Sequence, residues 1–305
     1  MYRFKNILIP VDNIAVKAGD IKYADTITRL AQSKKAYFVH IAPSLELPEE
    51  IRQLYPELLE PVDEFAGKKL CEDVCDVFSG DGRVDVQANI VEGDPLDQLL
   101  SMVVRKDIDL IIIQPGEGGS GSFRDLPEKL ARKAPCSVLI VPEGFQASTY
   151  SKILVPVDFS EESEHAVEVA LAFAKAESLT SVTAVHVYRV PAGFHKSGKS
   201  YDEFAEIMKQ NAEKQFNTFK GKFDTGSIAL EPVFLLNDSV VKGISEAMKS
   251  AAPDLVVMST RGRASGASVI MSSYTEKIIK DSTVPVLAVK KKGAGLNFLK
   301  ALLEI

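Results

Sequence analysis

The sequence contains few cysteines, no long apolar run and no excess of basic charge. Three cysteines among 305 residues are an odd number without a disulfide-like spacing, which favours a reducing compartment. No apolar run approaches the ~20 residues that span a bilayer, and the first residues lack the apolar segment of a signal peptide. The formal net charge of −6 gives no general attraction to nucleic acid or anionic membranes. We therefore predict a cytoplasmic protein without nucleic-acid or membrane partners.

Complete motifs for catalysis or metal binding are also missing from the sequence. There is no G-x-S-x-G, H-E-x-x-H or full Walker A pattern. Cys71 and Cys75 are four residues apart in a predicted helix and so share one face, but no nearby cysteine or histidine completes a zinc site. We interpret both as buried thiols and Cys136 as a core residue. We predict no catalytic residue and no metal ligand.

What the sequence does contain is a long internal repeat. Lys5–Asp12 is KNILIPVD, and Ser151–Asp158 is SKILVPVD. His40 and His186, in the next strand-like segments, are also separated by 146 residues (186 − 40). Solenoid repeats have periods of about 20–50 residues, so this period indicates two copies of a whole domain. We predict domains at residues 1–143 and 150–291, joined by the polar segment Pro142–Ser151, and a short amphipathic tail helix at residues 292–305.

Each copy alternates short apolar, β-branched runs with helical periodicity. The runs do not alternate with polar residues, so the strands should be buried on both faces, as in parallel sheets covered by helices. The sequence predicts an α/β fold of two doubly wound, five-stranded parallel sheets. The predicted strands are Asn6–Val11, Ala36–Ile41, Val84–Val91, Leu110–Gln114 and Ser137–Val141, then Lys152–Val157, Val182–Val187, Ala229–Leu235, Leu255–Ser259 and Val286–Val289.

Ligands of such sheets bind beyond the carboxyl ends of the strands, where the strand order reverses. In the second copy, strand four is followed by a segment that contains Gly262 and leads into a helix at Ser272 and Ser273. Free backbone N–H groups and the positive end of a helix favour an anion such as phosphate. The same residues also fit a ligand-free role, because Ser273 and Glu276 have the spacing of a capping box.

Two tandem copies that begin with ILVPVD-like strands and end with PVLAV-like strands resemble a tandem universal stress protein, over essentially the whole chain. This resemblance implies the strand order 3-2-1-4-5 of a Rossmann-like, adenine nucleotide alpha hydrolase-like sheet. The nucleotide-binding members of the family hold ATP with a loop of the pattern G-x-x-G-(nine residues)-G-[ST]. In the second copy the frame fits without gaps, but serine replaces glycine at Ser259 and Ser272, and only Gly262 and Ser273 match.

The resemblance also implies an adenosine contact for Asp158 and adenine-pocket contacts for Val187 and Met258. Asp158 has an alternative structural role, as an Asx turn or helix cap that opens the next helix, and the two roles are compatible. The predicted nucleotide-binding residues are therefore Asp158, Val187, Met258, Ser259, Gly262, Ser272 and Ser273.

The first copy departs further from the family pattern. Its glycine-rich loop contains Gly118 but has no phosphate-loop spacing, and Asp125 occupies the place of the phosphate-facing hydroxyl. We expect Asp125 to cap the following helix and to repel a triphosphate. The copies also differ after strand three, where Asn237 replaces Gly93, and we expect Asn237 to adopt a positive φ. The N-terminal domain should bind no nucleotide.

These patterns favour a stress-response sensing or signalling protein that binds ATP (with Mg²⁺) or AMP at most in its C-terminal domain, with slow ATP hydrolysis at most. The alternatives are a scaffold that acts through protein–protein contacts and an enzyme of the wider nucleotide-binding α/β group. The resemblance further implies that the two domains pair within one chain through their fifth strands, and it allows a homodimer.

Overall fold

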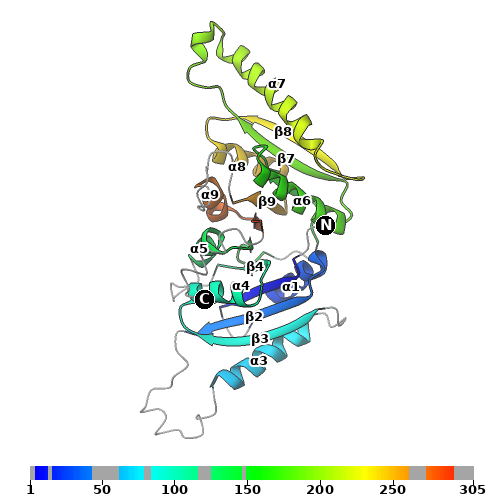
Figure 1. The fold of residues 1–305 in the computed structure, drawn as a ribbon, viewed down its shortest axis with the longest axis vertical. Helices are drawn as coiled ribbons and strands as arrows, with labels where there is room; N and C mark the ends of the chain where they lie inside the picture. The colour runs from blue at the N-terminus through cyan, green and yellow to red at the C-terminus, as the bar shows by residue number, and fades with distance from the viewer. Residues whose placement is uncertain are drawn as a thin grey trace. The chain divides into compact units, whose positions relative to one another are not determined.

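A computed structural model describes residues 4–12, 16–42, 62–78, 84–115, 125–145, 149–260 and 273–291, with only the backbone of residues 62–66, 76, 77 and 273. The chain divides into two compact units, Arg3–Ser148 and Thr149–Lys291. Strands and helices alternate along each unit (Figure 1). None of the described helices is long and apolar enough to cross a membrane.

The N-terminal unit contains a parallel sheet in the order β3-β2-β1-β4-β5. Every residue of β4 and β5 is buried, as expected for strands that helices cover on both faces. The strands are β1 (Asn6–Val11), β2 (Lys35–Ala42), β3 (Asp85–Glu92), β4 (Leu110–Ile113) and β5 (Ser137–Ile140).

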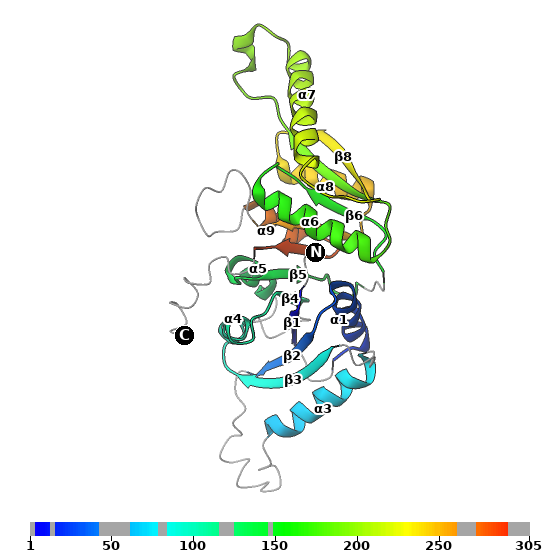
Figure 2. The ribbon, with the colours of Figure 1, turned by 45° about the vertical axis from the view of Figure 1, so that its right-hand side comes forward.

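Two pairs of helices cover this sheet. Helix α1 packs beside α3, and α4 packs beside α5. Figure 2 shows the two pairs on opposite faces of the sheet. The helices are α1 (Ala18–Ala31), α3 (Val62–Val77), α4 (Pro95–Arg105) and α5 (Leu126–Lys133).

The C-terminal unit repeats the same topology. Its parallel sheet has the order β8-β7-β6-β9-β10, which is again 3-2-1-4-5 when the strands are counted within the unit. The predicted fold class is confirmed. The strands are β6 (Ile153–Pro156), β7 (Ser181–Tyr188), β8 (Ala229–Leu236), β9 (Leu255–Ser259) and β10 (Val286–Val289).

The helices of the C-terminal unit follow the same plan, with α6 against β6 and β9, α7 against β7 and β8, and α8 beside α9. A short 3-10 helix precedes α7. The elements are α6 (Glu161–Ala176), η2 (Phe194–Ser197), α7 (Tyr201–Lys220), α8 (Val240–Ala251) and α9 (Ser273–Asp281).

Helix α7 begins with a capping box that the sequence S-Y-D-E signals. The Ser200 hydroxyl accepts a hydrogen bond from the Glu203 amide (3.2 Å), and the Glu203 carboxylate accepts one from the Ser200 amide (2.8 Å). These bonds hold the pKa of Glu203 below its usual value. The stability that the carboxylate contributes is therefore present above the ordinary glutamate pKa and is lost as the pH falls through the lowered value.

The duplication extends to the backbone conformation. Gln32 and Ser178, 146 residues apart (178 − 32), both have positive φ, at 51° and 57°. Asp107 and Ala252, 145 residues apart (252 − 107), also have positive φ, at 51° and 43°. All four follow the ends of equivalent helices, where a left-handed residue ends the helix. The two copies therefore share turn geometry even where the residues differ.

One glycine of α8 is required by a close contact with the sheet. A Cβ built at Gly243 would lie 2.8 Å from both Cγ1 and Cγ2 of Val187. Helix α8 can approach β7 this closely only because residue 243 has no side chain. A Cβ built at Gly67, in the interior of α3, would meet no atom within 4 Å.

We predict that Gly243→Ala destabilises the C-terminal unit by about 1–3 kcal/mol, because overpacking outweighs the gain in helix propensity. Gly67→Ala is the matched control and should stabilise α3 by up to about 1 kcal/mol. Hydrogen exchange followed by mass spectrometry measures the opening free energy of each helix separately. Equal effects of the two substitutions would contradict the contact between Gly243 and Val187.

Candidate functional site

The sheet register of the C-terminal unit brings the predicted residues to one edge. Pro156 pairs with Val185, so Asp158, two residues later, stands level with Val187 at the end of β7. Leu154 pairs with Val256, so Asp158 also stands level with Thr260, just after β9. Strand β6 lies between β7 and β9, and this is the point where the strand order reverses. In doubly wound sheets, ligands bind beyond the strand ends at this point.

Asp158 organises the turn from β6 into α6. Its Oδ1 accepts hydrogen bonds from the Ser160 amide (3.1 Å), the Ser160 hydroxyl (2.5 Å) and the Ser163 hydroxyl (2.6 Å). The bond from the Ser160 amide is the predicted Asx turn. Ser160, rather than Asp158, is the N-cap of α6, and its hydroxyl accepts a bond from the Ser163 amide (3.2 Å). The structural role predicted for Asp158 is confirmed, and its nucleotide role stays a prediction.

A cluster of packed aromatic rings lies beside Asp158. Phe159 is buried, has a positive φ of 63°, and stacks on the His186 ring with centroids 4.3 Å apart. It also packs edge-on against Phe216 and Phe219 of α7. A positive φ is strained for a bulky residue, so the packing of the ring is what holds the backbone in this conformation.

The two repeated histidines have a structural role. The Nδ1 atom of His186 lies 2.9 Å from the Val157 carbonyl, and Nδ1 of His40 lies 3.1 Å from the Val11 carbonyl. Because a carbonyl only accepts, each Nδ1 carries the proton in this contact. Each histidine thus joins the end of the second strand of its sheet to the end of the first.

Val187 and Met258 pack against neighbouring elements of the C-terminal unit, and their predicted adenine contacts stay predictions. Val187 is half-buried, and its methyl groups lie against Gly243 of α8. His186, the preceding residue, stacks on Phe159, which itself packs against Phe216 of α7. Val187 and His186 therefore point to opposite faces of the sheet, as expected for neighbours in a strand. Met258 is buried and pairs with Ala288 of β10.

A hydrogen bond ties both ends of the predicted phosphate loop together. Ser259, half-buried at the end of β9, accepts a bond through its carbonyl from the hydroxyl of Thr275, in the first turn of α9 (3.1 Å). The Thr275 side chain is buried. Ser259 and Thr275, which flank the predicted loop, therefore lie close together at the edge that carries Asp158. Gly262 and Ser272 lie outside the described residues, and Ser273 is the first residue of α9, with its side chain undescribed.

In the N-terminal unit, the start of α5 differs from the sequence prediction. Asp125 occupies the N-cap position of α5, but its side chain makes no capping hydrogen bond. Its φ and ψ of −93° and 0° are helical, whereas a capping residue needs an extended conformation to turn its oxygen toward the helix amides. The glycine-rich loop that contains Gly118 lies outside the described residues.

The turn after the third strand of the C-terminal unit also differs from the sequence prediction. Gly93 has the positive φ (132°) that glycine permits, but Asn237, its counterpart, is not among the described residues with positive φ. Its side-chain Oδ1 instead accepts a hydrogen bond from the Ser239 amide (2.9 Å). The side chain closes the turn locally, so the backbone has no need of a left-handed conformation. Ser239 caps α8, because its hydroxyl accepts a hydrogen bond from the Lys242 amide (3.4 Å).

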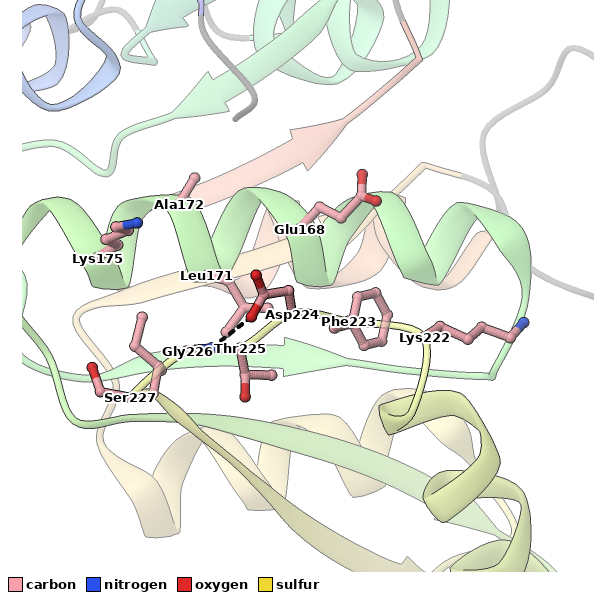
Figure 3. Close-up of a pocket in the computed structure, with 11 residues that line it drawn as sticks. Glu168, Leu171, Ala172, Lys175, Lys222, Phe223, Asp224, Thr225, Gly226 and Ser227 are labelled. Carbon is pink, nitrogen blue, oxygen red and sulfur yellow. Dashed lines mark hydrogen bonds between the residues drawn. The ribbon is translucent and has the colours of Figure 1, made fainter.

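A pocket that the sequence does not signal lies elsewhere in the C-terminal unit. It has a volume of about 670 Å³ between the second half of α6 and the segment Lys222–Ile228, which precedes β8 (Figure 3). Leu171 contributes apolar surface, and Lys175 and Asp224 contribute charge. Because this segment precedes β8, the pocket lies toward the amino ends of the strands. It is therefore separate from the edge that carries Asp158.

The fold is a doubly wound α/β domain that occurs twice along the chain. The model of the universal stress protein family matches residues 3–142 and 149–290. The chain therefore belongs to the universal stress protein family and contains two of its domains.

Individual relatives agree with this assignment. A universal stress protein of Methanocaldococcus jannaschii is 31% identical over 48% of this chain and 98% of its own length. A solved structure of a universal stress protein from Pseudomonas aeruginosa covers 99% of this chain and 98% of that chain, with a TM-score of 0.63 and 17% identity. One from Archaeoglobus fulgidus covers 95% and 98%, with a TM-score of 0.57 and 16% identity. At these identities the two solved structures support the fold alone.

We predict that Asp158→Ala destabilises the start of α6 by about 2–3 kcal/mol, because three donors lose a charged acceptor. Asp12, the equivalent residue of the first copy, is exposed, and Asp12→Ala should change local stability by less than about 0.5 kcal/mol. Hydrogen exchange at the first amides of α6 and of α1 measures the two effects. Unchanged protection in the Asp158 variant would contradict the structural role of this carboxylate.

Proposed function

We propose that this tandem universal stress protein binds an adenine nucleotide, ATP with Mg²⁺ or AMP, in its C-terminal domain and acts in stress sensing or signalling. The observation that carries the proposal is the bond from the Thr275 hydroxyl to the Ser259 carbonyl. It holds both ends of the predicted phosphate loop at the edge that carries Asp158. The nearby helix N-terminus favours an anion at that edge.

The serine substitutions in the loop are compatible with this role. Serine retains the backbone N–H that contacts a phosphate and adds a hydroxyl donor, although it is strained where φ must be positive. One solved universal stress protein is a complex with cAMP. That is a property of that protein, and the proposal for this chain rests on its own residues.

A cytoplasmic location forms part of the proposal. No disulfide joins Cys71, Cys75 and Cys136, which is usual in a reducing compartment. The predicted pairing of the two domains within one chain, and a homodimer, stay predictions that sedimentation of the intact protein can check.

We predict that the intact protein melts at a higher temperature in Mg-ATP. At ten times the dissociation constant, the ligand adds about 1.4 kcal/mol, or roughly 3–6 °C for a domain of this size. Gly262→Asp should abolish the shift, because a carboxylate in the loop repels the phosphates. Gly118→Asp places the same charge in the glycine-rich loop of the first domain and should leave the shift intact.

Two results would contradict this proposal. A melting temperature that millimolar ATP and AMP leave unmoved would reject nucleotide binding and favour the scaffold alternative. A shift that Gly118→Asp abolishes and Gly262→Asp leaves intact would place the nucleotide in the N-terminal domain.

A further inference from the structure

The cysteine pair of α3 needs no ligand to explain it. Cys71 is half-buried and Cys75 is exposed, so the interpretation of both as buried thiols is wrong, whereas Cys136 is buried as predicted. The Sγ atoms of Cys71 and Cys75 are 3.7 Å apart, as in a hydrogen bond between two thiols. The described residues contain no group of three or more His, Cys, Asp and Glu that could hold a metal ion.

The pocket between α6 and the segment Lys222–Ile228 is different, because some of its charges are not balanced within the protein. Two of its charged side chains have partners on α6. Lys222 forms an ion pair with Glu164, and Glu168 lies 3.3 Å from Nδ1 of His165. The charged side chains among the lining residues are Glu168, Lys175, Lys222 and Asp224.

Lys175 and Asp224 are the two charges without such a partner. In the part of the chain that the structure describes, neither side chain forms an ion pair, although both line the pocket. The Asp224 carboxylate accepts one bond, from the Gly226 amide (3.2 Å). Figure 3 shows Asp224 turned toward α6, and Lys175 on that helix, one turn beyond Leu171. A cation and an anion therefore face one cavity without neutralising each other.

Apolar side chains form the wall beside these charges. Leu171 and Ala172 of α6 are half-buried, and Ile228 is buried. Phe223 packs edge-on against Phe219, with ring centroids 5.0 Å apart, so its position is fixed by the core. The volume of about 670 Å³ lies within the range of about 300–1,000 Å³ that is usual for small-molecule sites. The pocket thus combines a preformed apolar wall with two opposite charges.

We propose that this pocket binds a small zwitterion with an apolar side chain, of the class of the hydrophobic α-amino acids. The ligand's ammonium group pairs with Asp224, its carboxylate pairs with Lys175, and its side chain packs against Leu171 and Phe223. An anion without an ammonium group would meet the Asp224 carboxylate unpaired, and a cation without a carboxylate would meet the Lys175 ammonium unpaired. Only a ligand that carries both charges is complementary to both.

The exposure of the two charged residues sets the strength of binding. Lys175 and Asp224 are both exposed, so each ion pair with the ligand is weakened by water. We expect a dissociation constant on the order of 1 mM, which falls within the range of metabolite-sensing affinities only for an abundant ligand. The pocket lies toward the amino ends of the strands, so the proposal does not rest on nucleotide binding at the carboxyl edge.

The first test titrates the intact protein, without nucleotide, with L-leucine, and follows binding by calorimetry and by NMR. Three matched probes each lack one feature of leucine. L-leucinamide lacks the carboxylate and 4-methylpentanoate lacks the ammonium group, and each should bind at least about 3-fold more weakly. Glycine lacks the apolar side chain and should bind at least about 10-fold more weakly.

The second test reverses the two charges. Lys175→Glu and Asp224→Lys should each weaken leucine binding by at least about 5-fold, because one end of the ligand then meets a like charge. The double variant Lys175→Glu/Asp224→Lys should recover most of the affinity, because a zwitterion can bind with its ends exchanged. A variant that merely misfolds would not be rescued in this way. Lys249→Glu, at an exposed lysine of α8, is the matched control and should leave binding unchanged.

Three outcomes would overturn the site. The first is the absence of heat and of NMR shifts at leucine concentrations well above the expected dissociation constant. The second is binding of leucinamide or 4-methylpentanoate as tight as that of leucine, because the pocket would then recognise one charge alone. The third is leucine binding that both single charge reversals leave intact, which would place the ligand elsewhere. None of these outcomes bears on nucleotide binding, which Gly262→Asp tests separately.

Discussion

The central strand pair of each sheet depends on one half-buried aspartate carboxylate. Strands β1 and β4 pair over only two residues, as do β6 and β9, yet the strand order reverses at these pairs. In the N-terminal domain the Asp109 carboxylate accepts bonds from the amides of Lys5 and Asn6 (2.9 and 3.0 Å). In the C-terminal domain Asp254 accepts bonds from the amides of Ser151 and Lys152 (2.7 and 3.0 Å). Each clamp sets the register of its sheet from the amino ends of the central strands.

The strand register that this carboxylate sets also positions the residues at the opposite, carboxyl edge of the sheet. Because parallel strands rise about 3.3 Å per residue, a register fixed at the amino ends also fixes which residues stand level at the carboxyl ends. A slip of one residue between β6 and β9 would move Asp158 away from Thr260 and turn alternate side chains to the other face of the sheet. The clamps are the same in both copies, whereas the residues at the carboxyl edge differ. The duplication therefore preserved the framework, and the differences between the copies lie at the carboxyl edge.

The strands could be predicted from the sequence because burial on both faces leaves continuous apolar runs that admit few alternatives. Strand β9 was predicted at its observed bounds, Leu255–Ser259, and β10 likewise. Turn chemistry was less predictable, because side chains compete with backbone conformation there. Asn237 closes its turn with a side-chain bond instead of a positive φ, and Asp125 takes a helical conformation that prevents capping. The spacing of Cys71 and Cys75 correctly predicted a shared face but not which face, since that depends on the packing of α3 against β3.

The candidate nucleotide-binding edge could be predicted only in part, because its features arise from contacts between segments far apart in the chain. The sequence frame can align Ser259 and Ser273 with a phosphate loop, but it contains no signal for the bond from Thr275 that joins the ends of that loop. Nor does it show that Phe159 adopts a positive φ and stacks on His186. Both features arise from contacts between segments far apart in the chain. An aromatic ring held in a strained conformation beside Asp158 restricts the volume at this edge, so a ligand there must fit against the Phe159–His186 stack or displace it. The nucleotide proposed for this edge must therefore be compatible with the Phe159–His186 stack as well as with the loop.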